Sequence, residues 1–292
     1  MQDTLIVLVH GVGLGAIYAL VGMSFNVVFN SSGILNFAQG NMLVLGGMFA
    51  FLVLPSVPGM GQWFVLLPAA ALLIAALLAF QGYITLLPLR SSVEQHSWLI
   101  TTLAVSVIIG AVILIYQGTA QQSVRSPFPA FWLLGTRVPA PYAMALGLAV
   151  VWFGLLRLFH TRMLTGLAIS AIAQDLDAAR AAGIRVRRLQ IIAFGISGLI
   201  VGSAGFVAAP VIAIANDSGV SYVLNGFVAA VIGGLGSDLG ALIGGLLVGM
   251  VSMYAAYTYG GEFQDAVSLA LLVAVLMLRP EGLFGRPAAR RV

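Results

Sequence analysis

Long apolar runs recur along the whole chain of 292 residues, and they constrain its fold more than any other feature. A run of 18 or more apolar residues is long enough to cross the hydrocarbon core of a bilayer as a helix. Only 8% of the residues are charged, whereas soluble domains carry about 25%. A soluble protein of this composition would lack the polar side chains that its surface needs. The sequence therefore predicts an all-α integral membrane protein.

The apolar runs divide the chain into candidate transmembrane helices. We expect a single transmembrane domain over residues 1–292, a polytopic helix bundle of about eight or nine transmembrane helices that includes short or broken ones. The candidate spans are residues 5–29, 35–54, 63–88, 98–116, 140–157, 190–214, 223–236, 240–257 and 264–278. The span at 223–236 has only 14 residues, which is about 21 Å as a helix, so we expect a broken or tilted element there.

The arginines predict the orientation of the bundle. All 13 Lys and Arg residues are arginine; six lie in residues 157–188 and four in residues 279–292. Because arginine in short loops marks the cytoplasmic side, we place both segments and the C-terminus there, which puts the N-terminus outside. Arg125 and Arg137 then lie outside, contrary to the rule. The acidic start MQDT is unlike a signal peptide, so we expect the first span to remain in the protein.

The composition excludes several classes of function. There is no lysine for a Walker A phosphate site or a Schiff base, and no cysteine for a disulfide or thiolate site. No catalytic motif and no cofactor or metal signature occurs, so we expect no enzyme. Nucleic-acid binding is not expected, since the arginines lie in short loops between apolar spans. Ionisable residues are nearly absent from the spans, with His10 as the exception, which disfavours a proton-coupled carrier.

Two glycine-interrupted segments in opposite halves of the chain, Ser31–Gly47 and Ile232–Gly249, are candidates for a transport path. Paired segments of this kind point to a site between the two halves of a transporter. The candidate path residues are Asn26, Asn36, Gln39, Gly40, Asn41, Gly233, Gly236 and Gly240. Two structural roles stay open as alternatives: the glycines suit close helix packing, and the amides suit hydrogen bonds between helices.

Charge gathers in the loop at about 160–188, which includes Asp175, Asp177 and Arg180. We expect one amphipathic helix from Thr165 to Ala182, with Gly183 at the C′ position and Asp177 paired with Arg180. Thr165 would cap the helix, and its apolar stripe would comprise Ile169, Ile172, Ala173 and Leu176. The helix either rests on lipid or docks into a protein groove; its small alanine side chains favour docking.

Four stretches resemble the LivH-type permeases of branched-chain amino acid importers, which belong to the ATP-binding cassette class. GLGAIYALVGMSFNVVFNSSGILNFAQGNMLVLGGMFAF (13–51) is similar to the opening of these permeases. GFVAAVIGGLGSDLGALIGGLLVG (226–249) and LRPEGLFGRP (278–287) resemble their C-terminal signature, and DLDAARAAGI (175–184) resembles the coupling loop of importer permeases. The likeness covers nearly the whole chain. Asp238 departs from the pattern, and we expect it in a turn near the cytoplasmic face.

The resemblance implies a complete importer in the bacterial inner membrane, surrounded by membrane lipid. Its parts would be two permease subunits, two ATPase subunits and a periplasmic substrate-binding protein; the second permease would be LivM-like or another copy of this chain. The ATPases would dock at residues matching the coupling positions, which are Gln174, Asp175, Ala178, Ala179, Arg180 and Gly183. Phe37 joins the path candidates because it matches the family's motif around Asn36 and Gly40.

The solute stays open at this point. Branched-chain amino acids are the first expectation, and amides, urea or other small solutes carried by related permeases are the alternative. Two other classes of protein compete with the importer subunit, a stand-alone secondary transporter and an intramembrane enzyme. The first would need ionisable residues at membrane depth, and the second a reactive side chain there.

Overall fold

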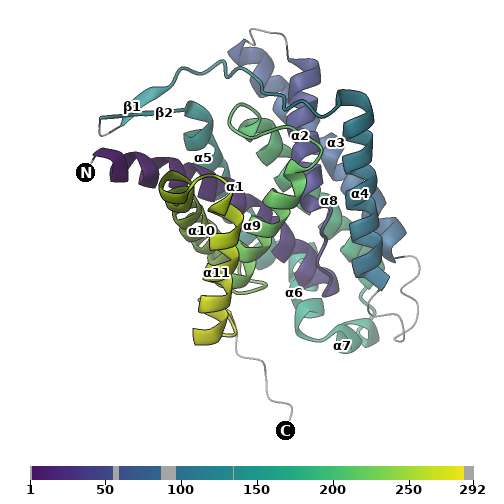
Figure 1. Ribbon diagram of the computed structural model, residues 1–292. Helices are drawn as coiled ribbons and strands as arrows, with labels where there is room; N and C mark the ends of the chain where they lie inside the picture. The colour runs from purple at the N-terminus through teal and green to yellow at the C-terminus, as the bar shows by residue number, and fades with distance from the viewer. Residues whose placement is uncertain (1, 55–58, 87–96, 134, 286–292) are drawn as a thin grey trace.

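The computed structural model describes residues 2–54, 59–86, 97–133 and 135–285 as a helical bundle (Figure 1). Within these residues there are eleven helices and one short β-hairpin. The elements are α1 (Gln2–Ser32), α2 (Gln39–Val53), α3 (Met60–Leu86), α4 (Ser97–Gln117), β1 (Phe131–Leu133), β2 (Thr136–Val138), α5 (Ala140–Arg162), α6 (Leu164–Gln174), α7 (Leu176–Ala181), α8 (Val186–Ala208), α9 (Ser218–Gly233), α10 (Asp238–Tyr259) and α11 (Phe263–Leu278). The all-α prediction is confirmed.

Each predicted span corresponds to a helix, but the helices differ in length. In the described part of the chain, six are long and apolar enough to cross a bilayer: α1, α3, α4, α5, α8 and α10. The helices α2, α9 and α11 have 15, 16 and 16 residues, which is about 23 Å against a hydrocarbon core of about 30 Å. The short element expected near 223–236 is therefore α9, and α2 and α11 are short as well.

The centre of the bundle is formed by α1 and α8. We compare the buried share of an apolar window of 18 residues in each helix. This share is 67% in α1 and 72% in α8, but only 11% in α4 and 17% in α5. Large aromatic side chains such as Tyr18, Phe25 and Phe194 are fully buried on these two helices. The outer helices α3, α4 and α5 instead expose Leu, Ile and Val side chains. This is the distribution expected where lipid surrounds the protein.

The two ends of the bundle carry different structures. Figure 1 shows the β1–β2 hairpin beside the N-terminal end of α1, and α6 and α7 at the opposite end of the molecule. The hairpin pairs Trp132 with Arg137 and is antiparallel. The hairpin and the charged loop therefore lie at opposite ends of the molecule. The arginines at 90, 286, 290 and 291 lie outside the described residues.

Glycine allows α1 and α10 to pack backbone against backbone. A Cβ atom placed on Gly15 would lie 2.7 Å from the carbonyl oxygen of Gly245, and one on Gly249 would overlap the backbone of Gly15. Gly233 of α9 and Gly240 of α10 are in similarly close contact. A Cβ atom on Gly233 would overlap the backbone of Gly240, and a Cβ atom on Gly240 would overlap the backbone of Gly233. Close packing therefore accounts for Gly233 and Gly240, because small residues let helices in membranes approach closely.

We predict that Gly249→Leu destabilises the protein by about 3 kcal/mol or more, because a leucine side chain would force α1 and α10 apart. The measurement is thermal unfolding of the purified protein in detergent. Gly154→Leu on α5 is the matched control, since a side chain at Gly154 meets open space. Equal melting temperatures for the two variants would contradict the prediction.

Candidate functional site

The charged segment forms two helices instead of the single one predicted from Thr165 to Ala182. Asp175 separates them: its backbone is extended (φ −153°, ψ 109°), and its Oδ1 accepts hydrogen bonds from the amides of Asp177 and Ala178, both at 2.9 Å. Asp175 is thus the N-cap of α7, and an aspartate that bonds nearby amides competes with a continuous helix. Thr165 is not a cap, because α6 begins at Leu164 after the extended residue Met163. We call α6 and α7 together the coupling segment.

The end of the coupling segment agrees with the prediction. Gly183 has a positive φ of 81°. The amide of Gly183 donates a hydrogen bond to the carbonyl oxygen of Arg180 at 3.0 Å. The amide of Ile184 donates one to the carbonyl oxygen of Ala179 at 3.1 Å. These two bonds form a Schellman motif with glycine at C′. The predicted Asp177–Arg180 pair is present at 3.4 Å, but such an exposed pair contributes little stability.

The coupling segment exposes most of the residues predicted to meet a partner. Gln174, Asp175, Ala178, Arg180 and Gly183 are exposed, whereas Ala179 is only 5% exposed and packs inward. On the inner side, Ile169 and Ile172 are buried and Leu176 is partly buried, as the predicted stripe requires. Including Ala173 in this stripe was wrong, since Ala173 is exposed and lines a cavity between α6 and the turn before α10.

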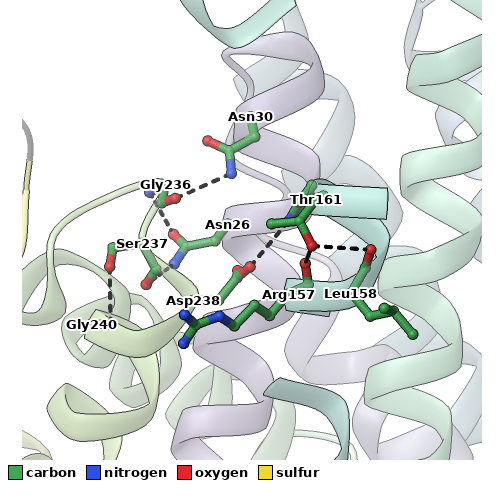
Figure 2. Close-up of polar contacts among 10 residues, drawn as sticks. Asn26, Asn30, Arg157, Leu158, Thr161, Gly236, Ser237, Asp238 and Gly240 are labelled. Atoms are coloured by element: carbon green, nitrogen blue, oxygen red, sulfur yellow. Dashed lines mark hydrogen bonds and ion pairs between the residues drawn. The ribbon is translucent and has the colours of Figure 1, made fainter. Parts of the chain in front are cut away.

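That turn, residues 234–237, is fixed to α1 by two asparagines. Asn26 donates to the carbonyl of Ser237 at 2.9 Å and accepts from the amide of Gly236 at 3.0 Å. Asn30 donates to the carbonyl of Gly236 at 3.3 Å (Figure 2). Gly236 has a positive φ of 86°, which favours glycine at this position. Both the nitrogen and the oxygen of the Asn26 side-chain amide therefore have a hydrogen-bond partner.

Asp238 follows this turn and makes a contact that was not predicted. It is the first residue of α10, after the N-cap Ser237, whose Oγ accepts from the amide of Gly240 at 3.1 Å. In Figure 2 its carboxylate points toward α5. There Oδ2 lies 3.3 Å from Nδ1 of His160, and both side chains are mostly buried. The pair joins residues 78 positions apart, so no local pattern in the sequence indicates it.

The remaining polar path candidates lie at the start of α2, where they bond to other helices. Asn36 and Gln81 exchange two hydrogen bonds of 3.2 and 2.8 Å. Gln39 donates to the Ser24 carbonyl on α1 and to Ser197 on α8, at 3.2 and 2.8 Å, and Asn41 donates to the hydroxyl of Ser106 on α4 at 2.8 Å. The sequence prediction did not include the partners Gln81, Ser106 and Ser197. The signal that could have indicated them is that each is a polar residue within an apolar run.

All four amides among the path candidates are buried: Asn26, Asn36 and Gln39 are 0% exposed and Asn41 is 3% exposed. The amide nitrogens of these four side chains all donate hydrogen bonds to residues of other elements, as described above. Two acceptors are left over, because Oε1 of Gln39 and Oδ1 of Asn41 are buried and have no hydrogen-bond partner among the described residues. Unsatisfied buried oxygens are uncommon in native proteins. They are the atoms of this cluster with spare capacity for a solute or a water molecule.

The two remaining candidates in the same region pack tightly. A Cβ atom on Gly40 would overlap the carbonyl oxygen of Gly219 at the start of α9. Phe37 lies in an aromatic group with Phe25 and Phe227, at ring-centroid distances of 6.5 and 6.1 Å. The structure thus brings the path candidates together in two groups. One lies around the start of α2 and the other around the turn 234–237, and both contact α1.

A carboxylate at the start of α11 was overlooked in the sequence. Asp265 accepts hydrogen bonds from Ser221 Oγ at 2.8 Å and from Asn225 Nδ2 at 2.7 Å, both on α9. The expectation that His10 is the one ionisable residue in the spans was therefore wrong. Asp265 lies in the first turn of α11, where a negative charge is favourable to the helix dipole. It holds the short helices α9 and α11 together.

Six apolar helices long enough to cross a bilayer, in the described part of the chain, are typical of a multi-pass membrane protein. Comparison with known families narrows this class. Residues 7–276 match the family described as the permease component of the branched-chain amino acid transport system, and the chain belongs to this family. The chain is thus a transport subunit, as the resemblance predicted.

Individual relatives match along almost the whole chain. The high-affinity branched-chain amino acid transport system permease protein LivH of Salmonella typhimurium is 29% identical over 97% of this chain and 96% of its own length. The corresponding permease protein BraD of Pseudomonas aeruginosa is 28% identical over 98% of this chain and 97% of its length. The permease protein LivM of Escherichia coli is 28% identical over 92% of this chain and 68% of its length. The likeness therefore extends to both kinds of permease.

We predict that Gln81→Leu destabilises the protein by about 1–3 kcal/mol, because it leaves the buried amide of Asn36 without its partner. Thermal unfolding in detergent measures the effect. Gln121→Leu makes the same change at an exposed position and should leave the melting temperature unchanged. A Gln81→Leu variant as stable as the control would show that the Asn36–Gln81 bonds contribute nothing.

Proposed function

We propose that this chain is a permease subunit of an ATP-binding cassette importer, and that it forms part of the path for branched-chain amino acids. Two ATPase subunits, a second permease and a periplasmic binding protein complete the assembly in the inner membrane of a bacterium. The second permease is LivM-like or another copy of this chain. The N-terminus is periplasmic and the C-terminus cytoplasmic. Family membership over residues 7–276 is the observation that carries the proposal.

The coupling segment supports the assignment of the ATPase dock. Its exposed residues Gln174, Asp175, Ala178 and Arg180 lie at one end of the bundle, where a soluble partner has access. The N-cap at Asp175 and the Schellman motif at Gly183 define both ends of α7, so this short helix is held in a fixed shape before a partner binds. A preformed helix loses little conformational entropy on docking.

For the path, the two groups of buried candidates give different expectations. In the group at the start of α2, which comprises Asn36, Gln39, Gly40 and Asn41, the side chains of Gln39 and Asn41 each carry an unpaired amide oxygen. The turn with Gly236 borders a cavity of about 440 Å³ on the side of the coupling segment. Movement of the short helices α2 and α9 would open a route between these groups. The apolar surroundings with a few amides suit a small neutral or zwitterionic solute.

The experiment is uptake of labelled leucine into proteoliposomes that contain this chain with its partner permease, ATPases and binding protein. Uptake that requires both ATP and the binding protein supports the proposal. ATP-dependent uptake of an amide, of urea or of another small solute, without leucine uptake, retains the importer and changes the solute. Uptake by this chain alone, without ATP, would contradict the importer and favour a stand-alone secondary transporter.

We predict that Ala178→Trp reduces co-purification of the ATPases at least about tenfold, because a large side chain on the exposed face of α7 would prevent close docking, at a cost of about 1.4 kcal/mol or more. Ala120→Trp is the matched control, since Ala120 is exposed in the connection between α4 and β1. Normal co-purification of the Ala178→Trp variant would remove α7 from the ATPase interface.

A further inference from the structure

The contact between His160 and Asp238 joins two helix ends of opposite polarity. Nδ1 of His160 lies 3.3 Å from Oδ2 of Asp238, and the side chains are 16% and 11% exposed. His160 is in the last turn of α5, and Asp238 is in the first turn of α10. The carboxylate of Asp238 is therefore at the end of α10 where the helix dipole favours a negative charge. The contact fixes the end of α5 that leads into the coupling segment to the beginning of α10.

On one side of this contact, the coupling segment is firmly joined to α5. Met163 is the single extended residue between α5 and α6. Gly166, in the first turn of α6, packs against the last turn of α5: a Cβ atom there would overlap the carbonyl oxygen of Phe159 and would lie 3.0 Å from Cα of His160. A displacement of the coupling segment therefore moves His160 with it.

On the other side, Asp238 directly follows the turn 234–237 and begins α10. This turn is bonded to Asn26 and Asn30 of α1 (Figure 2). It also adjoins the end of α9, whose last carbonyls, at Ile232 and Gly233, accept bonds from the amides of Leu283 and Phe284 at 2.8 and 3.0 Å. A displacement of Asp238 is therefore passed to α1, α9 and α10 together.

Between these two parts lies the cavity of about 440 Å³, whose lining includes Asn30, His160, Ser170, Gln174, Gly236 and Ser237. The coupling segment also packs directly against α1 and α8, and the His160–Asp238 contact at the border of the cavity adds a polar bridge between the two parts. The hydrogen bonding of the pair is incomplete, since Nε2 of His160 and Oδ1 of Asp238 are buried without a partner among the described residues. A pair held by one contact of 3.3 Å is poorly suited to a purely stabilising role, because its unpaired atoms cost free energy.

We infer that His160 and Asp238 are positioning residues that transmit the movement of the coupling segment to the turn 234–237 and, through it, to α1 and α10. The inference rests on the proposed function, since the movement it transmits is the one driven by the ATPases. Neither residue contacts a nucleotide or the solute in this role. They determine how much solute crosses the membrane for each ATP hydrolysed.

The test measures leucine uptake and ATP hydrolysis on the same proteoliposomes of the complete importer. For Asp238→Asn and for His160→Gln, we expect normal co-purification of the ATPases and unchanged hydrolysis, with leucine transported per ATP reduced by about fivefold or more. His10→Gln is the matched control, because His10 contacts Tyr142 at the other end of α5, with ring centroids 5.6 Å apart. This control should retain the wild-type ratio.

The absence of cysteine from the chain permits a second test. A variant with both His160→Cys and Asp238→Cys, combined with partner subunits free of cysteine, should have a low ratio of leucine to ATP. A short bifunctional thiol reagent should then restore the ratio by joining the two positions. Recovery of the ratio without a rise in the melting temperature of the complex would separate transmission of movement from stabilisation of the fold, since a cross-link that only stabilises would raise both.

Several results would overturn the inference: a wild-type ratio in Asp238→Asn and His160→Gln, an equal loss in His10→Gln, loss of the ATPases from either variant, or cross-linking without recovery. The proposed function fails in a different way. In that case the wild-type importer itself takes up no solute, or takes it up without ATP. The two failures are therefore distinguishable in one set of samples.

Discussion

Inside a bilayer, a polar group has no water to bond to, so the buried amides of the described residues take most of their hydrogen-bond partners from the chain itself. The arrangement of helices follows from this constraint. Asn26 supplies the missing partners for the turn 234–237, and the paired amides of Asn36 and Gln81 satisfy each other between α2 and α3. Glycines at the α1–α10 contact add close packing, which replaces the hydrophobic driving force that lipid removes.

The constraint also explains which features the sequence predicted. Helix positions follow from the lengths of apolar runs, because each span must satisfy its backbone internally. The C′ glycine at position 183 was predictable because its cause is local: the chain must turn out of α7, and glycine adopts the positive φ needed. The break at Asp175 was not predicted, because the same aspartate fits a helix interior and an N-cap, and the sequence alone does not decide between them.

The contacts that join distant segments were beyond prediction for a different reason. Asn26 and Ser237, Gln39 and Ser197, and His160 and Asp238 are separated by 211, 158 and 78 positions, and nothing in the chain marks one as the other's partner. The sequence marked one member of each pair, Asn26, Gln39 and Asp238, as unusual, but it did not mark Ser237, Ser197 or His160. Only the structure shows which of these residues form hydrogen bonds between helices and which keep an unpaired amide oxygen.

The placement of tight and loose contacts bears on mechanism. Helices α1 and α10 touch through glycine and form one unit, while a cavity separates the coupling segment from the turn 234–237. A transporter driven from outside the membrane needs both properties, since a rigid unit moves as a whole and a space beside it permits the movement. If all these contacts were tight, a push on α7 would strain the core. If all were loose, the push would be lost before it reached α1. Under the proposed function, a few polar contacts at the border of the cavity would give an intermediate coupling that a single substitution changes.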